Sequence, residues 1–91
     1  MNEFSFGMSV ETEGLTGELV AVYLRIRKGR IKTTKEYANG DVFADYDKHG
    51  VLLGIEILGP CRTSVLDKIA TTTPERRFVR RSIPKGMLVG A

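Results

Sequence analysis

The sequence predicts an α+β domain: an antiparallel β-meander of four or five strands with one or two short C-terminal helices packed on one face. Three observations lead to this fold class. Apolar and polar residues alternate along most of residues 4–58, as in strands that bury one face. Glycine-containing turns separate the alternating runs. Beyond Pro60, the apolar residues take the spacing of an amphipathic helix.

The first three expected strands differ in how apolar they are. The first covers residues 4–11, and its inward side chains are Phe4, Phe6, Met8 and Val10. The second covers residues 19–27, and its inward side chains are Val20, Val22, Leu24 and Ile26. Lys28-Gly29 is typical of a short turn and leads into a more polar strand at residues 31–37. Lysines discourage pairing with other chains, so we expect this third strand at an edge of the sheet.

A β-hairpin is expected over residues 41–58, after the tight-turn dipeptide Asn39-Gly40. Its apolar face consists of Val42, Ala44, Tyr46, Val51, Leu53, Ile55 and Ile57. The turn between its strands suits type I geometry, because Asp47 can accept backbone N–H bonds and Gly50 can adopt a positive φ. The opposite, solvated face of the whole sheet is expected to carry Glu11, Arg25, Arg27, Asp45 and Glu56.

Two short helices are expected after Gly59-Pro60. The first runs from Thr63 or Ser64 to Ala70, with Asp67 placed three residues after Ser64 as in a capping box. Its apolar stripe is Val65, Leu66 and Ile69. The second begins at Thr73-Pro74-Glu75, which supplies a cap, a proline in the first turn and an acidic residue near the helix N-terminus.

The second helix divides into a basic arc and an apolar arc. Arg76, Arg77, Arg80 and Arg81 share one side of the helical wheel, and Phe78, Val79 and Ile83 share the other. We expect the apolar arc to pack on the sheet. The tail that follows Pro84 is interrupted by glycine, and its apolar residues Met87, Leu88 and Val89 have no assured place in one chain's core.

The length of 91 residues predicts one domain with a small core. Residues 1–70 are expected to form the β-sheet domain with a short helix, and residues 71–91 a basic helical extension of the same domain. The charge is uneven, since residues 1–60 carry seven Lys and Arg against nine Asp and Glu, whereas residues 61–91 carry seven against two. The net charge of +3 therefore originates in the last third of the chain.

Composition argues against several classes of protein. The single cysteine, Cys61, excludes an intrachain disulfide, and no apolar run approaches the roughly 20 residues of a membrane span. The N-terminus lacks a basic region before an apolar stretch, so we expect no secretion signal and a cytoplasmic location. We expect no cofactor and no metal, because the one histidine, His49, lies at a turn and no glycine-rich phosphate loop is present.

No set of residues specifies a reaction, so we expect a protein that is not an enzyme. Five residues match positions of a calcium-binding loop: Asp45, Asp47, His49, Gly50 and Glu56. The expected flanks are strands rather than helices, and a hairpin turn accounts for the same residues. Cys61 beside Gly-Pro is expected to be structural rather than a nucleophile. An enzyme would require the three carboxylates to converge in one pocket.

Three pieces of the sequence resemble a family of small bacterial and archaeal proteins. They are Tyr23–Arg27 (YLRIR), Asp45–Gly50 (DYDKHG) and Leu52–Leu58 (LLGIEIL). The family is known as domain of unknown function 2283, also called YuzE-like. The resemblance implies a compact β-sheet with a helix, and it suggests an antitoxin-type partner of a compact toxin. It implies no catalytic residue.

The candidate binding site is the basic segment: Arg76, Arg77, Arg80, Arg81 and Lys85. Our first hypothesis is a small non-catalytic interaction module that binds a protein partner through this C-terminal arm. The alternative is nucleic-acid binding, because four arginines on one arc could neutralise several phosphates. A homodimer also fits, and the edge at residues 32–37 either pairs or is protected. The simplest alternative is a solvated charged face.

Overall fold

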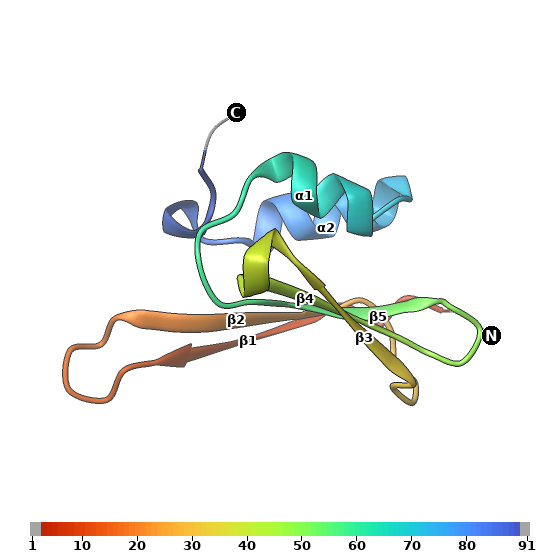
Figure 1. Ribbon diagram of the computed structural model, residues 1–91, viewed down its shortest axis with the longest axis horizontal. Helices are drawn as coiled ribbons and strands as arrows, with labels where there is room; N and C mark the ends of the chain where they lie inside the picture. The colour runs from red at the N-terminus through yellow and green to blue at the C-terminus, as the bar shows by residue number, and fades with distance from the viewer. Residues whose placement is uncertain (1–2, 90–91) are drawn as a thin grey trace.

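The fold is a five-stranded antiparallel sheet with two helices on one side, seen in a computed structural model that describes residues 3–89 (Figure 1). The strands are β1 (Gly7–Thr12), β2 (Leu19–Arg25), β3 (Thr33–Tyr37), β4 (Val42–Tyr46) and β5 (Leu52–Ile57). The helices are α1 (Thr63–Ile69) and α2 (Thr73–Ser82), with 3₁₀ turns at Ala38–Gly40 (η1) and Lys85–Met87 (η2). This architecture confirms the predicted α+β class.

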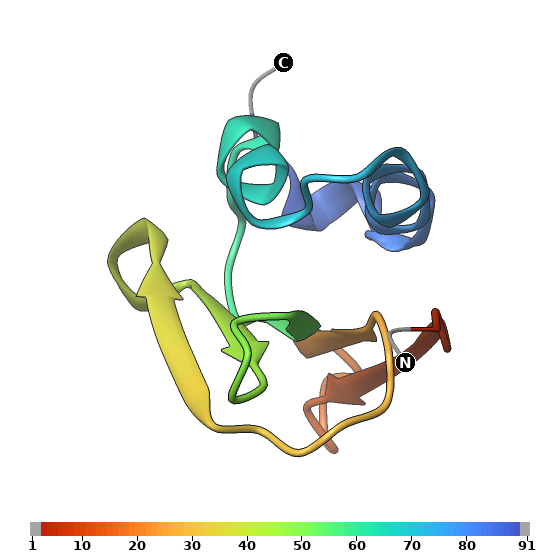
Figure 2. The same cartoon turned by 90° about the vertical axis from the view of Figure 1, so that its right-hand side faces the viewer.

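The strand order is β1-β2-β5-β4-β3, so the β1–β2 hairpin joins the β3–β4–β5 meander through the β2–β5 pair. The short turn expected at Lys28-Gly29 is wrong, because β2 and β3 are not neighbours. Their connection instead crosses the side of the sheet away from the helices (Figure 2). The connection passes close to the Leu53 side chain, since a Cβ added at Gly29 would lie 2.8 Å from Leu53 Cδ2.

A β-bulge in β5 moves one expected core residue. The register of β4 against β5 shifts between Asp45 and Tyr46, which leaves Leu53 as the extra residue. Leu53 is buried, but it packs against the crossing connection and is not part of the core cluster under the helices. Its expected place among the residues that face the helices is therefore wrong, and Leu52 belongs to that cluster instead.

The hydrophobic core lies between the sheet and the helices. Its largest fully buried side chains are Leu24, Ile26, Ile55, Ile57, Leu66, Val22, Val42 and Val79. The tail also contributes, because Met87 is only 6% exposed and Leu88 packs against the cluster. The Cys61 N–H donates to Met87 O at 3.0 Å, and the Val89 N–H donates to Cys61 O at 2.9 Å. The expectation that Met87 lacks a place in the core is therefore wrong.

Strand β1 is shorter and more exposed than expected. It begins at Gly7 rather than at Phe4, and Met8 and Val10 are each 52% exposed. Both pair with β2 residues whose side chains are fully buried, so they face the helix side of the sheet. The turn end of the β1–β2 hairpin extends beyond the helices (Figure 1). Met8 and Val10 therefore lie on the core face without the cover that the core has.

Both predicted turns of the hairpin region are confirmed. The Asp47 carboxylate accepts hydrogen bonds from the backbone N–H groups of His49 at 2.8 Å and Val51 at 3.0 Å. Gly50 takes a φ of 78°, which favours glycine. At the other end of β4, Asn39 and Gly40 both have positive φ, as the Asn-Gly dipeptide predicts.

The two helices begin differently from expectation. The Ser64–Asp67 capping box is wrong, because α1 has Arg62 as its N-cap and no side-chain capping bond. Helix α2 does have a capping box, formed by Thr72 rather than Thr73. Thr72 Oγ1 accepts the Glu75 N–H at 3.3 Å, while the Glu75 carboxylate accepts the Thr72 N–H at 3.2 Å.

Arg27 is buried rather than solvated, which corrects its expected position on the open face of the sheet. It is 7% exposed, and its Nη2 lies 3.1 Å from Glu75 Oε2. The backbone N–H groups of Ile26 and Arg27 both donate to Leu53 O, so the alternation of β2 is broken before Arg27. Glu75 therefore serves both as the helix cap and as the partner of a buried cation.

Candidate functional site

The basic surface of α2 is positioned by the apolar side of the same helix. Val79 is 1% exposed in the core, and the Phe78 ring stacks on Phe6 with 4.5 Å between ring centroids. These contacts confirm the predicted division of the helix, because they turn the arginines away from the sheet. The four arginines then fall into two pairs with different surroundings.

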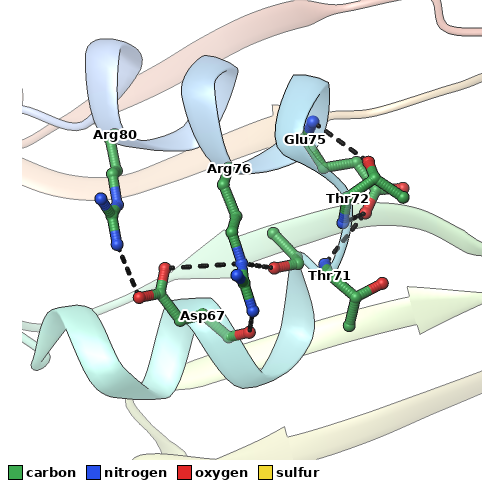
Figure 3. Close-up of polar contacts among 7 residues, drawn as sticks. Asp67, Thr71, Thr72, Glu75, Arg76 and Arg80 are labelled. Atoms are coloured by element: carbon green, nitrogen blue, oxygen red, sulfur yellow. Dashed lines mark hydrogen bonds and ion pairs between the residues drawn. The ribbon is translucent and has the colours of Figure 1, made fainter.

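Arg76 is held against the end of α1. Its Nε donates to Ala70 O at 2.7 Å and its Nη2 donates to Asp67 O at 2.9 Å (Figure 3). The last carbonyl groups of a helix have no partner within the helix and carry partial negative charge. The Arg76 guanidinium therefore completes the C-terminus of α1 and links the two helices.

Arg80 is the second arginine that reaches α1. Its Nη2 lies 2.6 Å from Asp67 Oδ2, and Arg76 Nε lies 4.0 Å from Asp67 Oδ1 (Figure 3). The Asp67 side chain is 30% exposed, so this carboxylate is partly enclosed between the two guanidinium groups. Asp67 has no role at the start of α1 and instead serves as an internal anion for α2.

Arg77 and Arg81 have no hydrogen bond or ion pair within residues 3–89, and both are exposed. An open surface hollow of about 580 Å³ lies beside α2. Its lining residues are Thr73, Arg76, Arg77, Arg80 and Arg81. The structure thus brings four of the five predicted site residues together. It does not bring in Lys85, which is exposed in η2 and does not line the hollow.

A second polar arrangement crosses the open face of the sheet. The Tyr23 hydroxyl on β2 donates to Asp45 Oδ2 on β4 at 3.1 Å, and Thr34 Oγ1 on β3 donates to Asp45 Oδ1 at 2.6 Å. The Tyr23 side chain passes over Gly54 on β5, where a Cβ would lie 1.9 Å from the hydroxyl oxygen. Partial burial, followed by the charge of Asp45 and its hydrogen bond, raises the pKa of Tyr23 to about 12.

The acidic residues considered for catalysis have separate roles. Asp47 caps its own turn, and the N–H groups of Val51 and His49 lower the pKa of its carboxyl. Asp45 is bonded to Tyr23 and Thr34. Among residues 3–89, no three His, Cys, Asp or Glu side chains gather where they could hold a metal ion.

Cys61 lies on the helix side of the sheet and is 3% exposed. Burial, together with the charge of Asp41, raises the pKa of its thiol. A thiol with a raised pKa is a poor nucleophile, because the thiolate is the reactive form. Cys61 is thus placed as a core residue, as the sequence predicted.

Residues 21–59 match the family model described as Protein of unknown function (DUF2283). This segment belongs to the DUF2283 family. No curated protein and no solved structure matches the chain. The matched segment includes all three residues of the Tyr23–Gly54–Asp45 arrangement, whereas the arginines of α2 lie outside it. In the part of the chain that the structure describes, no helix is long and apolar enough to cross a membrane.

Sequence reasoning missed two parts of the α2 surface. The sequence predicts a capping role for Asp67, whereas its spacing of nine residues from Arg76 and thirteen from Arg80 joins it to α2 across the turn between the helices. Thr73 was assigned to the α2 cap, but it lines the hollow one residue after the actual cap. The signal that could have revealed the first contact is the single acidic residue of α1, Asp67, which precedes the arginine-rich α2 across a short turn.

Proposed function

We propose that this protein is a non-catalytic binding module whose α2 surface engages an acidic segment of a partner protein. The observation that carries the proposal is the division of the arginine row: Arg76 and Arg80 are held by α1, while Arg77 and Arg81 are exposed without a polar partner in residues 3–89. An antitoxin-type partner of a compact toxin is one form of such a module.

The contact between Asp67 and Arg80 supports the proposal of an acidic ligand, because it shows how a carboxylate binds to this helix. It accepts a charge-assisted hydrogen bond from Arg80 at 2.6 Å. Arg77 and Arg81 are four residues apart, so they lie on adjacent helical turns. Two carboxylates with the same spacing on a partner helix would match them. Arg76 and Arg80 lose less entropy on binding than free side chains, since their guanidinium groups are already ordered.

The small number of unpaired positive charges on α2 favours a protein partner over nucleic acid. Among the arginines of α2, only Arg77 and Arg81 lack an internal partner in residues 3–89, so this surface would make few phosphate contacts and its non-specific affinity would be low at moderate salt. The aromatic residue of the helix, Phe78, stacks on Phe6 and is not available to stack on bases. Asn and Gln, which read adenine edges, are absent from residues 61–89.

A binding titration with defined probes tests the proposal. A fluorescent Asp/Glu-rich peptide, a single-stranded RNA and a DNA duplex of equal formal charge are each titrated with the full chain at several salt concentrations. We expect tighter binding of the peptide. The Arg77→Gln/Arg81→Gln variant should weaken peptide binding at least about tenfold, because two charge-assisted contacts are lost.

The matched control is Arg30→Gln/Arg62→Gln, which removes the same charge from two exposed arginines outside the hollow. This control should change peptide affinity much less. Equal losses of peptide affinity in both double variants would show that the peptide responds only to net charge. That result would contradict a site on α2. Tighter binding of RNA or DNA that is lost only in the α2 variant would replace the proposal with the nucleic-acid alternative.

A further inference from the structure

Strand β1 is an open edge without the usual protection. The sheet has two edges, β1 and β3. Strand β3 carries Lys35, and lysine on an edge strand discourages pairing with other chains. Strand β1 reads GMSVET, with neither lysine nor proline, and exposes Met8 and Val10. An exposed apolar edge of this length is able to pair with another strand.

We infer that β1 pairs antiparallel with β1 of a second copy of this chain, in a register centred on Ser9. This register places Met8 opposite Val10 of the second copy, and the symmetry repeats the contact. Opposed residues in an antiparallel pair share one face, so four exposed apolar side chains gather on the helix side of the joined sheets. The pairing continues each five-stranded sheet into the other. It does not involve the arginines of α2 and stands independently of the proposed function.

In the same register, the two copies are complementary in charge on the face of the sheet away from the helices. The Arg25 guanidinium lies over Gly7, where an added Cβ would be 2.9 Å from Nη2. Its Nε donates to Ser5 O at 2.7 Å, while Nη1 and Nη2 have no polar partner in residues 3–89. Glu11 of the second copy lies opposite Gly7 in this register. The Glu11 carboxylate of the second copy therefore lies on the same face as the Arg25 guanidinium. The symmetry of the pair gives two Glu11–Arg25 ion pairs.

Neighbouring registers do not match both faces. A register centred on Val10 sets Met8 against Thr12 and Glu11 against Ser9. It places Glu13 opposite Gly7, but Glu13 lies beyond the strand and its carboxylate accepts the Leu15 N–H. A register centred on Met8 sets Glu11 against Ser5, which precedes the strand. Only the pairing centred on Ser9 combines the apolar contact with the Glu11–Arg25 contact inside β1.

A cysteine cross-link tests the register. Cys61, the only cysteine in the sequence, is buried, so Ser9→Cys introduces an accessible thiol directly opposite its symmetry mate. We expect rapid formation of a disulfide-linked dimer under mild oxidation. The matched control is Thr12→Cys, whose copies would be about 20 Å apart along the strands, beyond the reach of a disulfide. Equal cross-linking of the two variants, or none at Ser9→Cys, would overturn the register.

Sedimentation velocity of the full chain over a concentration series tests the dimer itself. We expect Val10→Lys to weaken dimerisation at least about tenfold, because the substitution acts twice in the symmetric interface. The control Ile31→Lys alters an apolar residue of nearly equal exposure, 53%, in the connection before β3, and should leave the dimer unchanged. A wild-type chain that sediments as a monomer at every concentration, or a dimer insensitive to Val10→Lys, would overturn the inference.

Discussion

The Tyr23 hydroxyl reaches Asp45 by crossing directly over Gly54, with 3.1 Å between the hydroxyl oxygen and Asp45 Oδ2. Each of the three residues comes from a different strand, in the order β2, β5 and β4. The three sequence pieces that resemble DUF2283 each supply one of them, and the matched segment encloses them all. The contact therefore gives a structural reason for the glycine in the LGIEIL piece.

Gly54→Ala should destabilise the fold by about 1–3 kcal/mol, because the new methyl group overlaps the Tyr23 hydroxyl and forces the ring to move. Chemical denaturation measures the loss. Gly14→Ala is the control, since nothing lies within 4 Å of a Cβ there, and it should change stability by less than about 0.5 kcal/mol. In a Tyr23→Ala background the cost of Gly54→Ala should largely disappear. An unchanged cost in that background would contradict the contact.

The stability of the protein should fall in alkaline solution partly through Tyr23. Its pKa is about 12 in the folded chain and 10.0 for the ordinary side chain, so the folded state holds the phenolic proton more tightly than the unfolded state. This contribution is fully present below pH 10 and is lost as the pH rises toward 12. Denaturation curves across this range should show a steeper loss for the wild type than for Tyr23→Phe. Parallel curves would contradict the shift.

Glu75→Gln should cost about 3–5 kcal/mol of stability, because it leaves the Arg27 charge buried without its anionic partner. This loss is large for a domain of this size. Glu36→Gln on exposed β3 is the matched control and should have little effect. Replacing both partners, as Arg27→Met/Glu75→Gln, should cost less than Glu75→Gln alone, because glutamine can keep the capping contact and no unpaired charge stays buried. The same large loss in the double variant would show that the ion pair itself is not responsible.

Met87→Ala should destabilise the chain by about 2–5 kcal/mol, as expected for a truncated core side chain. Val89→Ala, two residues away and 45% exposed, should change stability by about 0.5 kcal/mol or less. Thermal or urea unfolding of the two variants separates a packed tail from a free arm. Similar small losses of stability for both substitutions would contradict the burial of Met87 in the core.

The local structure of the meander was predictable because its signals are local. Alternation predicted the buried face of β4 and, from Val22 onward, that of β2, whereas Val20 is 43% exposed at the irregularity in the β1–β2 register. Asp47 and Gly50 predicted the turn between β4 and β5. The division of α2 into an apolar arc and a basic arc followed from helical periodicity. These features depend on residues within a few positions of one another.

The remaining features depend on contacts between distant segments. The β2–β5 pairing was missed because Lys28-Gly29 is an ordinary turn dipeptide, and nothing nearby shows that the chain continues across the sheet over Leu53. Burial of Arg27 depends on Glu75, 48 residues later. The candidate site was found as a basic arc, but its division into held and free arginines depends on Asp67 in another helix.

The most direct measurement of the central claim compares the two arginine pairs of α2 by binding and by unfolding. Arg77→Gln/Arg81→Gln should lower affinity for the acidic peptide at least about tenfold and leave the free energy of unfolding within about 0.5 kcal/mol of wild type. Arg76→Gln/Arg80→Gln should instead destabilise the chain by about 1 kcal/mol or more, because it removes the contacts to Asp67 and Ala70. A peptide affinity that is unchanged by Arg77→Gln/Arg81→Gln would contradict the account.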